Sequence, residues 1–270
     1  MPVPPPAGQI AGMTLSVDLN SDMGEGFGPW TMTDDAGLME IVTSSNIACG
    51  FHAGDADTMA QVMALATKTG VGIGAHPGFP DLQGFGRRQM QVPLPTLANM
   101  IRYQVGAAQA MARAAGGKVR HLKLHGALSN MACTDAAMAR ACYEAALDVD
   151  PDIIIMGLAA TEMETVCRDL GCNWAGEIFA DRAYNADGTL VDRRLPGAMI
   201  HDGEEAARRM VEMVKAGAIL TGDGKKLKTR IDTICIHGDS AEAVAFSGQV
   251  RKGLEAAGIA ISQFTGAPLS

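Results

Sequence analysis

Residues 46–55 combine three side chains that can bind a metal ion or transfer a proton. Cys49, His52 and Asp55 stand three positions apart in this segment, and glycines at positions 50 and 54 allow sharp backbone turns. Asp55 also stands where it can cap the helix that is expected to follow. Cys49 is a further candidate, as a nucleophile. The segment therefore predicts either a catalytic loop or a helix cap with polar neighbours.

Similar groups follow other apolar segments of the chain. Lys123 and His125 repeat every second residue, so a strand would present both on one face, where burial is costly unless they are paired or used. We expect one site to contain these two residues and the polar residues of the other segments. The candidates are Asp18, Asn20, Glu25, His52, Asp55, His76, Lys123, His125, Asp181, Arg182 and His237.

Predicted strands and helices alternate along the chain and must position these residues. Strand patterns cover residues 15–20, 45–49, 71–75, 119–125, 152–157, 174–180 and 231–237. Helical patterns cover residues 34–42, 58–69, 95–115, 134–147, 161–170, 204–216 and 240–257.

This alternation predicts either a closed barrel or a doubly wound sheet. Polar residues follow six of the seven predicted strands, which favours the barrel because an open sheet concentrates its site at one switch point. We therefore predict one α/β domain over residues 14–270, a seven-stranded (β/α) barrel. The Pro-rich residues 1–13 are predicted to form a loose tail.

Composition excludes several classes of function. The net charge of −8 and the 4% aromatic content argue against a nucleic-acid-binding protein. The longest apolar run, residues 153–160, is too short to span a membrane, and the first residues do not form a signal peptide. The six cysteines form no Cys-x-x-Cys pair, which indicates reduced thiols in a cytoplasmic protein.

No motif for a serine nucleophile or a phosphate-binding loop is present. The remaining acids, histidines, lysine and arginine suit acid–base or metal-assisted hydrolysis of a small polar molecule.

Several uninterrupted motifs make the chain resemble the lactam-utilisation (LamB/YcsF) family from about residue 15 to residue 265. They occupy residues 18–28 (DLNSDMGEGFG), 45–55 (SNIACGFHAGD), 74–81 (GAHPGFPD), 84–88 (GFGRR), 179–184 (FADRAY) and 236–239 (IHGD). The resemblance implies an irregular seven-stranded barrel, similar to the glycoside hydrolase and deacetylase barrels.

The resemblance also implies a function. It implies ATP-dependent opening of 5-oxoproline to glutamate, as the A subunit of a 5-oxoprolinase that works with two partners, the B and C subunits. ATP with Mg²⁺ would be the co-substrate, and a homo-oligomer is left open. The lactam is a poor electrophile, so phosphorylation of its amide oxygen would prepare it for attack by water.

The expected roles follow from these steps. Asp18 or Asp55 would act as the base, Lys123 would stabilise charge beside His125, and Arg182 would hold the substrate carboxylate. The other residues expected to orient the substrate are Asn20, Glu25, His52, His76 and His237.

Two alternatives remain. The first is a metal-dependent hydrolase of a carbohydrate or amide, similar to the deacetylases, in which His52 and Asp55 would contribute to a metal site. The second is a non-catalytic protein that only binds a small ligand.

Overall fold

Seven parallel strands close into a barrel in the computed structural model, which describes residues 15–238 and 242–269. The barrel strands are β1 (Ser16–Met23), β2 (Ser44–Ala48), β3 (Gly72–His76), β4 (Val119–Lys123), β5 (Ile154–Leu158), β6 (Trp174–Phe179) and β9 (Thr233–Cys235). Each strand pairs with its neighbour in this order, and pairing of β1 with β9 closes the ring. The predicted seven-stranded (β/α) barrel is confirmed.

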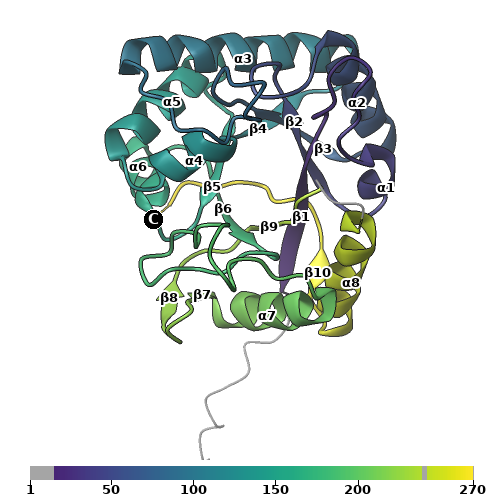
Figure 1. The fold of residues 1–270 in the computed structure, drawn as a ribbon, viewed down its shortest axis with the longest axis vertical. Coiled ribbons are helices and arrows are strands. Elements are labelled where there is room, and N and C mark those ends of the chain that lie inside the picture. Colours follow the sequence, from purple (N-terminus) through teal and green to yellow (C-terminus); the bar gives the residue numbers. More distant parts are fainter. Residues whose placement is uncertain (1–14, 239–241, 270) are drawn as a thin grey trace, which may run out of the picture.

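Helices surround the strands (Figure 1). They are α1 (Asp35–Met39), α2 (Ala56–Thr69), α3 (Leu94–Ala114), α4 (Gly126–Ala132), α5 (Ala136–Val149), α6 (Glu162–Leu170), α7 (Gly203–Ala216) and α8 (Ala243–Ala256). The longest, α3, buries the stripe that its spacing predicts, including Leu97, Ile101 and Val105. Burial of such stripes against the sheet forms a continuous apolar layer outside the barrel.

The structure differs from the prediction in a few elements. Strand β1 continues three residues beyond Asn20, to Met23. The short helix α4 and the hairpin of β7 (Ala218–Leu220) and β8 (Lys226–Lys228) were not predicted, because seven and three residues are too short for a clear period. The short strand β10 (Ala260–Ile261) pairs with β1 outside the ring and agrees with the short strand that the sequence indicates within residues 259–264. The predicted tail and residues 240 and 241 of the predicted last helix lie outside the described residues.

The inside of the barrel is polar. Alternate residues of β1 point inward, and Asn20 donates a hydrogen bond to Thr233 at 2.7 Å and accepts one from Asn46 at 2.8 Å. His121 contacts Asn46 through Nε2 at 2.8 Å. Its imidazole occupies the space beside Gly74, where an added Cβ would lie 2.0 Å from Nε2. A hydrogen-bonded polar core therefore leads from the start of the barrel toward its mouth.

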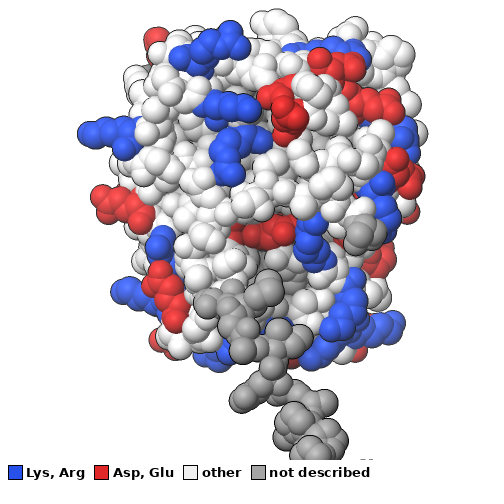
Figure 2. All heavy atoms as spheres, turned by 180° about the vertical axis from the view of Figure 1, so that it is seen from behind, with Lys and Arg blue, Asp and Glu red and all other residues white. Residues whose placement is uncertain are grey.

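Charges of both signs are interspersed on the face of the molecule seen in Figure 2. Neither sign covers this face. Within residues 15–238 and 242–269, no helix combines the length and apolar character needed to cross a bilayer.

Candidate active site

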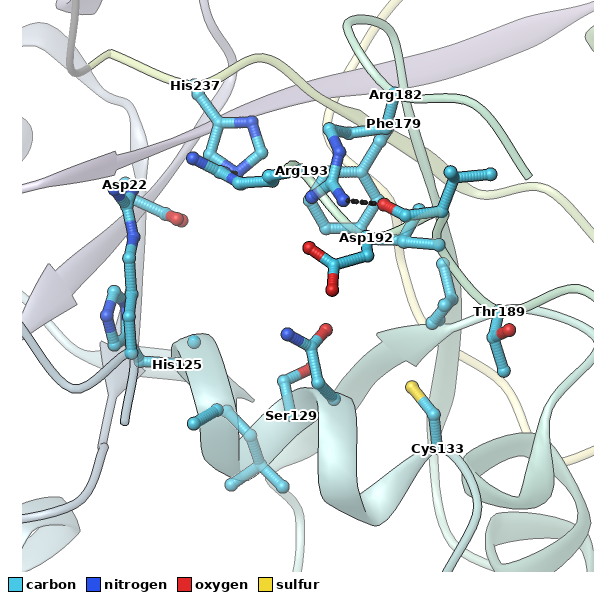
Figure 3. Close-up of a pocket in the computed structure, with 18 of the residues that line it drawn as sticks. Asp22, His125, Ser129, Cys133, Phe179, Arg182, Thr189, Asp192, Arg193 and His237 are labelled. Carbon is cyan, nitrogen blue, oxygen red and sulfur yellow. Dashed lines mark hydrogen bonds between the residues drawn. The ribbon is translucent and has the colours of Figure 1, made fainter. Parts of the chain in front are cut away.

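A cavity of about 880 Å³ opens at the carboxyl ends of the strands. Figure 3 shows Asp22 and His125 on one side of this space, Arg182 and Phe179 across it, and Ser129 on α4. Six of the predicted site residues line the cavity: Glu25, His76, Lys123, His125, Arg182 and His237. The other five, Asp18, Asn20, His52, Asp55 and Asp181, are not among the lining residues.

Lys123 is the centre of a buried ion cluster at the base of the cavity. Its Nζ lies 2.8 Å from Asp22 Oδ1, 2.9 Å from Glu177 Oε1 and 3.1 Å from Cys235 Sγ. Burial alone would lower the pKa of Lys123, but Asp22, Cys235 and Glu177 outweigh it and raise the pKa well above its usual value. The side chain is therefore a fixed ammonium group that faces the cavity.

Asp22 is the carboxylate that connects this cluster to the histidines. Its Oδ2 lies 3.3 Å from His76 Nε2. Burial disfavours the charged carboxylate, but His76 and Lys123 outweigh that effect and hold the pKa of Asp22 well below its usual range. Asp22 thus stays ionised at neutral pH.

Three histidines and a glutamate form a second buried group. His76 is the last residue of β3, and Glu25, His52 and His125 follow the ends of β1, β2 and β4. Ligand atoms of these four residues lie within 4.8 Å of one another. The rings of His52 and His125 stack with their centroids 3.6 Å apart. Burial is the main cause that lowers the pKa of His52 well below its usual value and that of His125 to about 3.

Two arginines and a histidine form the opposite wall. His237 lies between Asp181 Oδ2, 2.7 Å from its Nδ1, and Arg193, whose guanidinium donates to Nε2 at 2.8 Å. Arg182 donates to the Val191 carbonyl at 2.6 Å, whereas its buried Nε has no hydrogen-bond partner in the described part of the chain. This wall suits recognition of a carboxylate or a phosphate.

Asp55 lies elsewhere, as the N-cap of α2. Its carboxylate accepts hydrogen bonds from the backbone N–H groups of Thr58 at 2.8 Å and Gly28 at 2.6 Å. The groups of candidate metal ligands found among the described residues contain His52 but not Asp55, so the predicted pairing of these two at a metal is not formed. The sequence suggests helix capping as one of two functions of Asp55, and the geometry supports that function.

Replacing Asp55 by Ala is therefore expected to lower stability and leave turnover intact. Loss of the cap leaves two N–H groups without this acceptor, and we expect Tm to fall by about 2 to 4 °C. Asp55→Asn, which keeps a capping side chain, is the control, and thermal unfolding of both variants is the measurement. A loss of kcat with no change in Tm would return Asp55 to the catalytic candidates.

Asp18 is sealed inside the barrel. It accepts hydrogen bonds from Thr43 at 2.6 Å, Ser44 at 2.7 Å and Thr233 at 2.5 Å, and it has no exposed surface. Burial raises its pKa to about 7, against the opposing effect of these hydroxyls. This position suits a structural carboxyl group, because a substrate in the cavity would not contact it.

The raised pKa of Asp18 predicts a pH-dependent contribution to stability. Between its unfolded pKa of 3.8 and its folded pKa of about 7, the folded state holds the proton more tightly. The contribution is complete below pH 3.8 and is lost as pH rises through 7. Relative to Asp18→Asn, the unfolding free energy of the wild type should fall by about 2 kcal/mol between pH 5.5 and 7.5.

Urea denaturation of both proteins across this pH range is the measurement. The exposed Asp57→Asn variant should follow the wild type. A difference between wild type and Asp18→Asn that stays constant with pH would contradict the prediction.

Asp22 and Glu177 are the principal residues absent from the predicted site. Asp22 continues the two-residue alternation of Asp18 and Asn20, but the predicted strand ends at Asn20. Glu177 is an acid inside an otherwise apolar strand, a signal that alone could have indicated a buried pair. Cys49 is buried in the apolar layer, and burial raises its pKa to about 12, which removes it as a nucleophile.

Comparison with known proteins yields consistent matches over most of the chain. The model of the LamB/YcsF family matches residues 17–268. The A subunit of 5-oxoprolinase from Ruegeria pomeroyi is 66% identical over 248 residues, which are 92% of this chain and 98% of that protein. The A subunit of 5-oxoprolinase from Rhodopseudomonas palustris strain BisA53 is 52% identical over 250 residues, with the same coverage of each chain.

Solved structures agree. The lactam utilization protein from Thermus thermophilus has a TM-score of 0.87 and 40% identity, over 93% of this chain and 100% of that one. A putative cellobiose-phosphate cleavage protein from Enterococcus faecalis shares the fold, with a TM-score of 0.56 and 13% identity over 93% and 98% of the two chains.

Proposed function

The chain belongs to the LamB/YcsF family, and from this premise we propose that it is the A subunit of a 5-oxoprolinase. In this proposal it hydrolyses the lactam of 5-oxoproline to glutamate, coupled to ATP and together with the B and C subunits. The observation that carries the proposal is the near full-length 66% identity to the A subunit of a 5-oxoprolinase. The cavity adds support because cations and carboxylates, the kinds of group that such a reaction uses, are among the residues that line it.

The first step would activate the lactam carbonyl. Transfer of the γ-phosphoryl group of ATP to the amide oxygen forms a C–O–P linkage and releases ADP. Water then attacks the same carbon, and negative charge develops on the groups around it. The Lys123 ammonium, fixed by Asp22 and Glu177, supplies a positive charge for this purpose with no reorganisation.

Asp22 is the carboxylate best placed to act on the attacking water. It lines the cavity and stays ionised because of its low pKa. In the proposed step, its free lone pairs orient the water and take up one proton as the new C–O bond forms. The ring C–N bond then breaks, and the nitrogen takes up a proton as the amine, which leaves an acyl phosphate of glutamate. A second water hydrolyses this acyl phosphate to the carboxylate of glutamate and releases phosphate.

Arg182 is the proposed partner of the substrate carboxylate. Burial, then repulsion by Arg193, lowers its pKa to about 10, which still leaves it a cation at neutral pH. Its buried Nε offers a donor that no described residue uses. A bound carboxylate would satisfy that donor and balance the charge of this wall.

The test is glutamate formation from 5-oxoproline and ATP, with this chain alone, with the B and C subunits added, and with those two subunits only. We expect glutamate and ADP in equal amounts when all three proteins are present, and no glutamate when this chain is omitted. Equal rates with and without this chain would refute the proposal. ADP formation without glutamate by the B and C subunits would assign the phosphoryl transfer to them.

A further inference from the structure

Backbone carbonyls fix the ring nitrogens of two buried histidines. His76 Nδ1 lies 2.8 Å from the carbonyl oxygen of Lys123, and His125 Nε2 lies 2.8 Å from that of Phe85. A carbonyl oxygen can only accept, so each of these nitrogens carries the proton. In the neutral rings, His76 Nε2 and His125 Nδ1 therefore present lone pairs.

These two lone pairs face each other. His125 Nδ1 and His76 Nε2 are only 2.9 Å apart, a distance at which two acceptors repel unless a cation lies between them. A shared proton or a metal ion would remove the repulsion. The surroundings of His52 and Glu25 indicate which of these two cations is present.

A proton shared by His76 and His125 would not explain why the ring nitrogens of His52 are buried without hydrogen bonds to described residues. His52 has no exposed surface, and neither ring nitrogen has a hydrogen-bond partner in the described part of the chain. Its Nε2 lies 3.6 Å from Glu25 Oε1, which in turn lies 3.7 Å from His125 Nδ1. A buried imidazole without a partner is costly, whereas one ion among the four groups would use all of them.

The separations match the size of a metal site. Four ligands about 2.0–2.1 Å from a tetrahedral ion lie about 3.3 Å from one another, close to the 2.9, 3.6 and 3.7 Å found here. Three imidazoles and one carboxylate favour zinc and similar transition metals over Mg²⁺ or Ca²⁺, which prefer oxygen ligands. The carbonyls behind His76 and His125 are the orienting partners that metal-bound histidines usually have.

Glycines in the loop after β3 pack their backbone directly against the rings of His52 and His125. A Cβ at Gly78 would lie 2.8 Å from His52 Nδ1, and one at Gly86 would lie 2.7 Å from both His52 Cβ and His125 Cδ2. Side chains at these positions would push the stacked rings apart. The loop thus keeps His52 and His125 in place before any ligand binds.

A neighbouring group provides a contrast. Asp22, Cys235 and His237 also lie close enough to share an ion. However, Lys123 Nζ already contacts Asp22 and Cys235, so an ammonium group supplies the positive charge there. We propose that Glu25, His52, His76 and His125 bind one divalent transition-metal ion of the zinc class, beside the Lys123 cluster.

Direct metal binding by the untagged full-length chain tests this site. The protein is stripped with a chelator, loaded with Zn²⁺ or Co²⁺, desalted and analysed for metal content. We expect one ion per chain and visible Co²⁺ bands of a four-coordinate site. His52→Ala should weaken Zn²⁺ binding at least about 100-fold in competition with a chromogenic chelator, and the conservative Glu25→Gln should weaken it and shift the Co²⁺ bands.

The exposed His201→Ala variant is the matched control and should bind like the wild type. Circular dichroism shows whether each variant is folded. Wild-type protein that retains no ion, or a folded Glu25→Gln variant that binds with unchanged affinity and spectrum, would overturn the proposal. So would a histidine NMR spectrum of the metal-free and metal-treated chain that shows the same proton shared by His76 and His125.

This test does not depend on the proposed function, because it measures metal content without turnover. A chain that binds the ion and fails the glutamate assay would refute only the function. A chain that supports glutamate formation but retains no ion after loading with Zn²⁺ or Co²⁺ would refute only the metal site.

Discussion

Lys123→Met is expected to reduce kcat/KM for glutamate formation about 10³-fold in the complete enzyme. The substitution keeps the length of the side chain and removes the only positive charge that contacts both Asp22 and Glu177 in the described structure. It takes the ammonium partner away from two buried carboxylates and leaves Asp22 with His76 alone as its ion-pair partner among the described residues, so the unfolding free energy should also fall by about 3 to 5 kcal/mol. Steady-state kinetics and urea denaturation measure the two effects separately.

A double variant distinguishes lost chemistry from lost stability. Lys123→Met combined with Glu177→Gln also neutralises one of the two carboxylates that lost the ammonium partner, so part of the stability should return while activity stays low. The exposed Lys118→Met is the matched control and should behave like the wild type. Recovery of activity together with stability would show that Lys123 is needed for folding only.

Asp22→Asn is expected to reduce kcat at least about 100-fold with a smaller effect on KM. The amide has the size of the carboxylate and can still accept a hydrogen bond from Lys123, but it cannot take up a proton. The measurement is kcat and KM for 5-oxoproline in the presence of the B and C subunits. Loss of kcat alone is the signature of a group that acts in the transition state.

The control for this variant is Asp57→Asn, the same substitution at an exposed position. Asp18→Asn is the more informative comparison, because Asp18 lies on the same strand but away from the cavity. If Asp18→Asn lost as much kcat as Asp22→Asn, the inference that Asp18 is structural would be wrong.

The sequence predicts the barrel well because its signals are local and repeated. Apolar periodicity identifies the seven barrel strands and most helices, and polar residues at strand ends indicate a common mouth. Lys123, His125, His76 and His237 could be predicted as neighbours on this basis. Their placement needs only the topology and not the details of side-chain packing.

A different cause explains why the sequence does not show that Asp18 and Asp55 lie outside the cavity. Asp18, Asn20 and Asp22 have the same local pattern, and only the height of each residue along the barrel decides which one reaches the cavity. Height depends on strand stagger, which arises from long-range pairing such as that of β1 with β9. Asp55 shows the same limit, since a short polar loop does not reveal which way its carboxylate turns.

Ring closure also determines when the site can exist during synthesis. Strand β1 pairs with β9, which lies more than 200 residues later in the chain. At a synthesis rate of about 5–20 residues per second, this edge of β1 therefore stays unpaired for roughly 10 to 40 s. Asp18 pairs with Thr233 on that edge, and a charged group there discourages pairing with other chains. We therefore expect the carboxylate of Asp18, which later lies in the polar core, to disfavour aggregation of the unfinished barrel.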